Sequence, residues 1–478
     1  MQDQSQTTRA IVFAAFVVVF AGALIVPAVL WGVAEGSDAG SVQSSVTDSE
    51  IASLVAFVQD ERELEFEDAV PVVFLADDEF EAALAETQGD VDSAEFENAA
   101  AQLRALGLIE GDIDLQAAID ELLAAEVLGF YDTESRSITV RGEELSPAVR
   151  TTLVHELTHA LQDQHFELDL IDNDTDAETD DERAGALRAV VEGDATRVQN
   201  AYTAGLSAAE LQSVVSEEGT HAQAAAGLDV PDVLQAWLVV PYTFGPAFVE
   251  GLVQTAGIEA VDQAIADPPA SEQEILFPDL YREDREPADV ATPAMPGGAT
   301  EIASGDFGVV TLIMMLAERL DPQAAMAVAE SWDGDAFVLY KRSDGVSCVN
   351  LAVAGESAQA TQMIRDVFSA WVELMPPGSA AVAENAEFAA VTSCDPGTAA
   401  SGYTTGDGAD TLMRLGLRDA FLAQLEAAGL PSNLAACLTD RFLAGFSTEE
   451  LLAFSIQDLT PELQAQIEQW AIECAAPA

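Results

Sequence analysis

Residues 146–166, SPAVRTTLVHELTHALQDQHF, contain three of the four histidines in the chain. Within this stretch His155, Glu156 and His159 form the pattern H-E-x-x-H. The Ser-Pro pair at its start suits a helix N-cap and a first helical position, and apolar residues recur at helical spacing. Because side chains four residues apart lie on one face of a helix, the stretch predicts a helix that presents two imidazoles one turn apart.

This pattern indicates a metal site. Two imidazoles on adjacent turns can bind one zinc ion, and the intervening Glu156 can act as general base on a water bound to that ion. A chance cluster of this kind is rare in a chain with so few histidines. A catalytic zinc has three protein ligands and one open position, so His155 and His159 require a third partner.

The sequence offers two candidates for this third ligand. His165 has the spacing of the metzincin pattern, but Gln162 replaces the glycine at which the metzincin chain turns back. A helix that continues through Gln162 would turn His165 about 120° away from His159. Glu192 lies in the next helical stretch among apolar neighbours, where a buried carboxylate needs a partner. We therefore favour Glu192, with His165 as the alternative. Asp194 is either a support for a ligating histidine or a solvated acid.

The charge of the chain excludes some classes of partner. The 478 residues include 84 acidic and 18 basic side chains, for a net charge of −66, and 49% of the residues are hydrophobic. The hydrophobic fraction is typical of a globular protein. So negative a protein is repelled by nucleic acids and by anionic lipid surfaces. We interpret the charge as an adaptation to a salty environment, with an acidic composition shared by the whole organism as the alternative.

Residues 10–31 form an uncharged apolar run that is about as long as a membrane is thick. A cleaved signal peptide usually has a shorter apolar core of about 7–15 residues, so we expect an uncleaved single-pass anchor, with a signal segment as the alternative. Arg9 precedes the run and acidic residues follow it, which places residues 1–9 in the cytoplasm and the bulk of the protein outside the cell membrane. Residues 32–49 are small and polar, as in a linker.

The remainder predicts an α+β protein that is mostly helical. Residues 50–375 form the main domain, with a β-hairpin at 126–141 directly before the H-E-x-x-H stretch. Residues 376–408, rich in Pro, Gly, Ser and Thr, are expected to be a linker, and residues 409–478 a small helical accessory bundle. The acidic stretch 168–182 is expected to be a solvated loop, with a calcium site as the alternative.

All four cysteines lie in the last third of the chain, away from the histidines. An even number in an exported chain indicates two disulfides. Of the three connectivities, the simplest pairs Cys348 with Cys394 and Cys437 with Cys474.

The histidine-bearing helix, followed by the VEGDA sequence around Glu192, resembles the gluzincin-type zinc metallopeptidases, and more closely membrane-anchored or exported members from bacteria and haloarchaea. Softer similarities lie at residues 241–252, 268–281 and 332–340, although Phe277 replaces a histidine that relatives tend to have. The resemblance implies a zincin fold, with the site between two helices and a small β-sheet. It implies His155, His159 and Glu192 as metal ligands and Glu156 as general base.

These expectations lead to one function and one alternative. The first is zinc-dependent hydrolysis of peptide bonds at the outer face of the membrane, on a peptide or protein substrate. Tyr242, in a stretch that Pro and Gly residues are expected to interrupt, is our candidate donor to the oxyanion, and His221 is the second candidate. The alternative is a catalytically inactive, zinc-stabilised scaffold that binds partners at the cell surface. An intact Glu156 favours the enzyme, since a structural zinc site does not require that carboxylate.

Overall fold

The computed structural model describes residues 48–87, 93–142, 144–168, 181–225, 228, 230–282, 285–385, 387–427, 429–452 and 460–475. Residues 48–409 of this part belong to one compact unit and residues 410–475 to a second. The fold is mostly helical with small sheets, as the sequence predicts. The expected tail and anchor segment, and nearly all of the acidic stretch at 168–182, lie outside the described residues.

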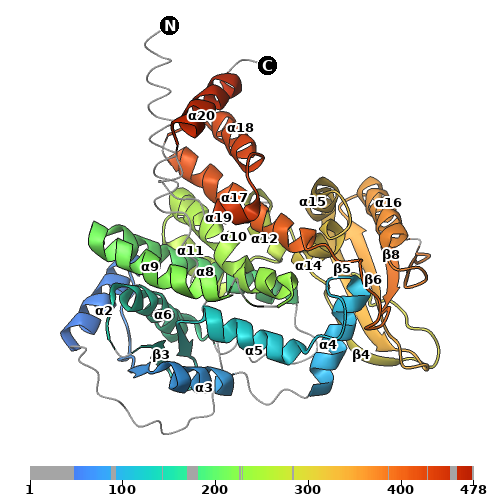
Figure 1. Ribbon diagram of the computed structural model, residues 1–478, viewed down its shortest axis with the longest axis horizontal. Helices are drawn as coiled ribbons and strands as arrows, with labels where there is room; N and C mark the ends of the chain where they lie inside the picture. Colours follow the sequence, from blue (N-terminus) through green and yellow to red (C-terminus); the bar gives the residue numbers. More distant parts are fainter. Residues whose placement is uncertain are drawn as a thin grey trace. The chain divides into compact units, whose positions relative to one another are not determined.

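A small sheet adjoins the H-E-x-x-H helix (Figure 1). Its strands are β1 (Val72–Leu75), β2 (Gly129–Asp132) and β3 (Ser137–Arg141), in the order β1-β3-β2. Strand β3 pairs in parallel with β1 and antiparallel with β2, which confirms the predicted hairpin. Helix α6 (Pro147–Phe166) follows directly and packs on this sheet with its buried leucines.

The ends of α6 have clear local causes. The side chain of Ser146 accepts a hydrogen bond from the backbone N–H of Val149 at 3.2 Å, which satisfies one of the free donors at the helix start. The helix continues through Gln162 and ends where Glu167 adopts a left-handed backbone with φ of 54°. The chain therefore does not turn back at Gln162, as the metzincin pattern would require.

Two long helices follow α6. Helix α8 (Asp181–Ala204) packs against α6, and α10 (Asp232–Ala256) packs against α8. Their backbones meet at glycines, because a Cβ on Gly193 would collide with Gly245 and a Cβ on Gly245 would collide with the Ala189 carbonyl. This close approach fixes where α8 and α10 present their neighbouring side chains.

The expected interruption of α10 at residues 240–245 is wrong. The helix is continuous, although Pro241 and Pro246 lie inside it. Each proline removes a backbone donor and costs about 3 kcal/mol in a helix interior, and burial of the apolar face of α10 against α8 outweighs this cost. By length and composition α10 is the one described helix that could cross a membrane, but 44% of its apolar window is buried inside the protein.

The second sheet is antiparallel, with the strand order β4-β5-β6-β8-β7. Its strands are β4 (Thr300–Gly305), β5 (Trp332–Lys341), β6 (Ser347–Gly355), β7 (Ala380–Val382) and β8 (Ala389–Cys394). Residues 376–408 are therefore not a linker, since they supply β7 and β8. Cys348 and Cys394 are register partners on β6 and β8 and form the expected disulfide.

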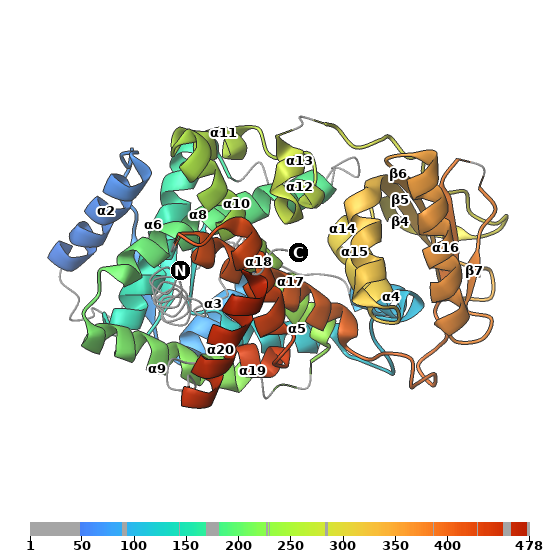
Figure 2. The ribbon, with the colours of Figure 1, turned by 90° about the horizontal axis from the view of Figure 1, so that it is seen from above.

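Further helices surround the two sheets, and Figure 2 shows α14, α15 and α16 beside the larger one. They are α2 (Asp48–Arg62), α3 (Asp77–Thr87), α4 (Ser93–Leu106), α5 (Leu115–Glu126), α9 (Ala208–Ala225), α11 (Glu259–Ala266), α12 (Glu272–Leu276), α13 (Pro278–Tyr281), α14 (Val309–Ala317), α15 (Pro322–Ser331) and α16 (Ala358–Leu374). Residues 268–300, rich in Pro and acidic residues, favour a long surface loop, but α12 and α13 give part of this segment helical structure.

The second unit is a small helical bundle, as the sequence predicts. Its helices are α17 (Asp407–Ala427), which begins at the end of the first unit, α18 (Ser432–Leu443), α19 (Thr448–Leu452) and α20 (Pro461–Cys474). Its core includes the stacked rings of Phe421 and Phe442, with centroids 5.2 Å apart. The disulfide between Cys437 and Cys474, also as expected, joins α18 to α20.

Candidate metal centre

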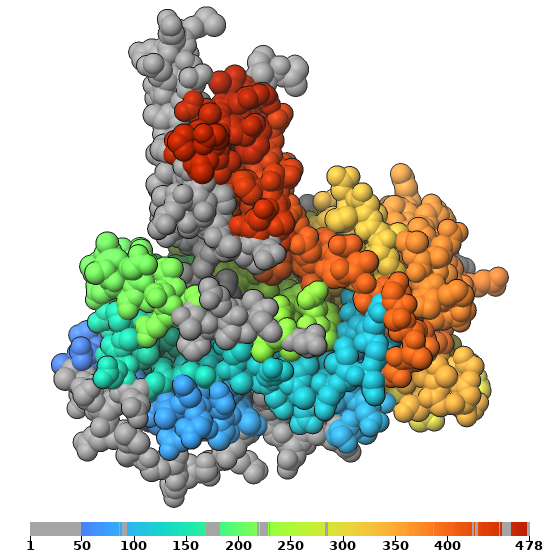
Figure 3. All heavy atoms as spheres, viewed as in Figure 1, coloured from blue at the N-terminus to red at the C-terminus, as the bar shows by residue number. Residues whose placement is uncertain are grey.

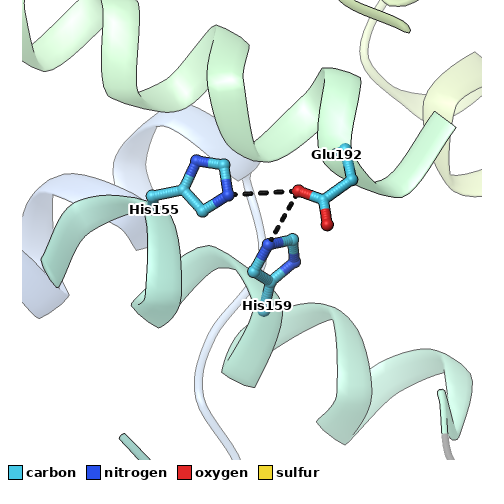
Figure 4. Close-up of side chains that lie close together, drawn as sticks. All are labelled: His155, His159 and Glu192. Carbon is cyan, nitrogen blue, oxygen red and sulfur yellow. Dashed lines mark hydrogen bonds and ion pairs between the residues drawn. The ribbon is translucent and has the colours of Figure 1, made fainter. Parts of the chain in front are cut away.

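Three side chains from α6 and α8 converge in the interior of the first unit (Figure 4). One oxygen of Glu192, Oε2, lies 3.2 Å from Nε2 of His155 and 3.2 Å from Nε2 of His159. Each of the three residues can offer one ligand atom, and these atoms all lie within 4.8 Å of one another. None of the three residues is more than 1% exposed. This group can hold a metal ion.

Hydrogen bonds on the far side of each ring orient the two imidazoles. Nδ1 of His155 lies 2.9 Å from Oε1 of Gln199, and Nδ1 of His159 lies 3.0 Å from Oε1 of Gln162. Because an amide oxygen only accepts hydrogen bonds, each Nδ1 carries a proton, and in the neutral ring Nε2 offers its lone pair towards Glu192. A neighbouring acceptor commonly fixes the tautomer of a metal-binding histidine in this way.

The electrostatics of the group call for a positive charge between the ligand atoms. Burial alone would raise the pKa of Glu192, but when the imidazoles carry protons on Nε2, the charge of His159 and the hydrogen bonds from both rings hold this pKa at about 2. For His159, burial opposes protonation, yet Glu192 raises the pKa. Two lone pairs and a carboxylate oxygen at 3.2 Å repel one another unless a proton or a metal ion lies among them. The donor set therefore fits a divalent cation.

A buried polar chain extends from His159 to the first described helix. The amide nitrogen of Gln162 donates to Oδ2 of Asp194 at 2.8 Å, and the same oxygen lies 2.6 Å from Nε of Arg62 in α2. The side chains of Arg62 and Asp194 are both 0% exposed, and Arg62 also pairs with Asp262 at 2.7 Å. Asp194 thus supports His159 as expected, although it does so through Gln162.

Glu156 lies on α6 between the two histidines and is fully buried. Burial raises its pKa to about 8, against the opposing effects of His159 and of the Tyr131 backbone N–H. Strand β2 passes closely here, since a Cβ on Gly129 would lie 3.5 Å from Cγ of Glu156. A carboxyl group with a pKa close to neutrality is suited to accept and release a proton.

The other residues singled out in the sequence have different surroundings. Tyr242 is buried in α10, with its ring centroid 6.2 Å from that of His155, although it lies on a helix and not in an irregular segment. His165 is on another side of α6, where Nε2 donates to the Glu65 carbonyl at 2.9 Å. The side chain of His221 lies outside the described part of the chain.

The sequence does not reveal Gln162, Gln199 or Arg62 as part of the site. The spacing of Gln162 from His159, three residues along one helix, is the one available signal. No family model, curated protein or solved structure matches this chain. The description of the metal centre therefore depends on the H-E-x-x-H motif and on the geometry of its surroundings.

Proposed function

We propose that the chain is a gluzincin-like zinc peptidase, in which His155, His159 and Glu192 hold the ion and Glu156 is the general base. The observation that carries this proposal is the convergence of three buried ligand atoms from two helices, with the buried carboxyl group of Glu156 on the same helix as both histidines. Two imidazoles and one carboxylate are the ligand set of many catalytic zinc sites. Zinc, when bound, would acidify a water molecule and polarise the scissile carbonyl.

The residues of the chain divide the remaining tasks. Glu156 takes a proton from the attacking water and delivers it to the leaving amine. Gln199 and Gln162 hold the histidines with Nε2 towards the ion. Tyr242, beside the ring of His155, is the proposed donor to the oxyanion.

The proposed location is the outer face of the cell membrane, with residues 10–31 as the anchor. Two disulfides support this location, because such bonds persist in oxidising compartments. The net charge of −66 supports a salty medium.

One observation favours the scaffold as a second candidate function. His155, Glu156, His159 and Glu192 are each at most 1% exposed, and structural zinc sites are closed to solvent whereas catalytic sites keep an open position. As a peptidase, the protein must open a path to Glu156 during each cycle, whereas a scaffold needs no such motion.

The experiment measures bound zinc and the hydrolysis of casein and of a fluorogenic peptide mixture. The wild type is compared with Glu156→Gln and with Glu373→Gln, an exposed site on α16 as the matched control. We expect Glu156→Gln to keep its zinc and to lose a factor of about 10² or more in rate, and Glu373→Gln to be unchanged. Equal hydrolysis by wild type and Glu156→Gln would rule out the proposed base. Zinc without hydrolysis in the wild type would favour the scaffold.

A further inference from the structure

A cleft of about 540 Å³ lies in the first unit, apart from the metal ligands but built on the same helices. Helices α4 and α5, which lie side by side in the space-filling view (Figure 3), form one wall. Helices α8, α10, α12 and α14 complete it, together with residues 306–308 and β5. Its volume is in the range of about 300–1,000 Å³ that is usual for ligand sites.

The cleft and the metal centre share two helices. On α8, Glu182, Gly185 and Arg188 line the cleft, and Glu192 follows Arg188 by one turn, about 6 Å along the helix axis. On α10, Pro241 lines the cleft, and the next residue is Tyr242, whose ring lies beside that of His155. A ligand in the cleft would therefore lie next to the residues that surround the metal ligands.

Most of the lining is apolar, but one wall carries carboxyl groups. The apolar side chains include Leu103, Leu115, Trp237, Val310 and Phe337. The acidic side chains are Glu182, Glu272 and Asp306, and Arg188 is the one cationic residue of the lining. The lining of the cleft thus contains three carboxyl groups and one guanidinium group.

This wall is not part of the solvated acidic surface. Glu182 is only 4% exposed, and its two oxygens accept hydrogen bonds from the backbone N–H groups of Val309, at 2.6 Å, and Glu272, at 2.9 Å. Burial, followed by the charges of Glu272 and Asp335, raises the pKa of Glu182. These two N–H groups lie at the first residues of α14 and α12, so Glu182 caps both helices and is held in place at the edge of the cleft.

Two glycines make room for the acidic wall. A Cβ on Gly185 would come within 2.5 Å of Oε1 of Glu272, and a Cβ on Gly308 would come within 2.9 Å of Oε1 of Glu182. Gly308 also has a φ of 89°, a backbone conformation that other residues rarely adopt. Glycine at both positions allows Glu182 and Glu272 to meet at the cleft.

We propose that this cleft binds a segment of the peptide substrate that carries an arginine or lysine next to apolar residues. The carboxyl groups supply charge complementarity to the cation, and a partly buried cation needs such partners. The apolar walls cover the neighbouring side chains. This proposal rests on the proposed peptidase function, and it names the class of substrate that the peptidase would select.

The test measures binding to the full-length, zinc-loaded protein carrying Glu156→Gln, so that the peptides stay intact. Fluorescence anisotropy compares short amidated peptides that differ at one position, which carries arginine, neutral citrulline or glutamate between two leucines. About 1 M NaCl shortens the screening length to about 3 Å and suppresses attraction by the overall negative field. We expect the arginine peptide to bind about tenfold more tightly than the citrulline peptide, or about 1.4 kcal/mol, and the glutamate peptide to bind most weakly.

Variants then locate the preference within the protein. Glu272→Gln and Asp306→Asn should each reduce the preference for arginine to less than about threefold, which corresponds to about 0.6 kcal/mol. Thr311→Trp, which fills the cleft, should abolish binding of all three peptides. Glu373→Gln removes one exposed carboxylate elsewhere and should change nothing. Unchanged zinc content and circular dichroism show that each variant is folded.

Three results would overturn the assignment of the cleft: equal binding of the three peptides, an arginine preference that survives Glu272→Gln combined with Asp306→Asn, or arginine amide alone competing as well as the peptide. The outcome is separable from that of the peptidase proposal. Hydrolysis without a preference for arginine would refute the cleft and keep the peptidase. Charge-selective binding without hydrolysis in the Glu156-intact protein would refute the peptidase and keep the cleft as a peptide-binding site.

Discussion

Replacing Arg62 with methionine tests whether the buried ion pair between Arg62 and Asp194 supports both the stability of the protein and its affinity for metal. Methionine keeps much of the length of the side chain but removes the guanidinium that lies 2.6 Å from Asp194. Both side chains are 0% exposed, so the substitution leaves a buried carboxylate without its main partner. Breaking a buried ion pair from one side typically costs 3–5 kcal/mol. Arg197 remains 3.5 Å from the other oxygen of Asp194, so we expect about 3 kcal/mol, at the lower end of that range.

The same substitution should weaken metal binding. Without Arg62, Asp194 is free to move from the amide of Gln162, and Gln162 is the residue that fixes the ring of His159. Loss of such a supporting contact usually lowers metal affinity by about 10–100-fold. Zinc affinity is measured by competition with a chelator. Unfolding in urea is measured with EDTA present, because bound zinc would itself stabilise the fold. The readout is hydrogen exchange of peptides from α6 and α8.

Arg104→Met is the matched control. Arg104 forms an ion pair with Asp395, with N–O distances between 2.9 and 3.1 Å, away from the metal ligands, and the two side chains are 9% and 13% exposed. The substitution should lower stability by less than Arg62→Met, because water reaches this pair, and leave zinc affinity unchanged. The reasoning is refuted if Arg62→Met and Arg104→Met affect zinc affinity equally, or if Arg62→Met costs less than about 1 kcal/mol. Adding Asp194→Asn to Arg62→Met should restore part of the stability, since no buried charge is then left unpaired.

Three further outcomes follow from the structure. Glu192→Ala should lose zinc while His165→Ala keeps it, as measured by metal content after dialysis, because Nε2 of His165 is bonded to the Glu65 carbonyl. Burial raises the pKa of Asp419 to about 6, above about 3.9 in the unfolded chain, so ionisation of Asp419 costs stability as the pH rises from 4 to 6. Asp419→Asn should therefore gain about 1–2 kcal/mol at pH 7 and little at pH 4 in urea unfolding. Finally, the melting temperature should rise with NaCl concentration, because salt screens the repulsion within a chain of net charge −66.

Local signals in the sequence were enough to predict much of the fold. The cap at Ser146, the hairpin before α6 and the pairing of the cysteines all depend on residues that are close together in the chain or few in number. Strand β8 escaped prediction because its short, alanine-rich sequence lies among Pro, Gly, Ser and Thr residues. What makes it a strand is its pairing with β6, which is a property of the folded chain.

In the candidate metal centre, too, some residues can be predicted from local sequence and others only from the folded chain. The spacing of His155 and His159 is enough to predict that they share a helix face, and the apolar neighbours of Glu192 favour a charged partner. Arg62 has no such signal, because it approaches Asp194 only after α2 packs against α6 and α8. Helix α2 therefore contributes to the surroundings of the candidate metal centre through its last residue, Arg62.

Gln162 affects both the orientation of His159 and the choice between His165 and Glu192 as the third proposed ligand. Where the metzincin pattern has a glycine, this residue allows α6 to continue, and the continued helix carries His165 away from the candidate metal centre. The same side chain then bonds Nδ1 of His159 with its oxygen and Asp194 with its nitrogen. A glycine at this position would favour a turn, and it has no side chain to bond His159 or Asp194. Gln162 thus keeps His165 away from the candidate metal centre and orients the ring of His159 towards Glu192 on α8.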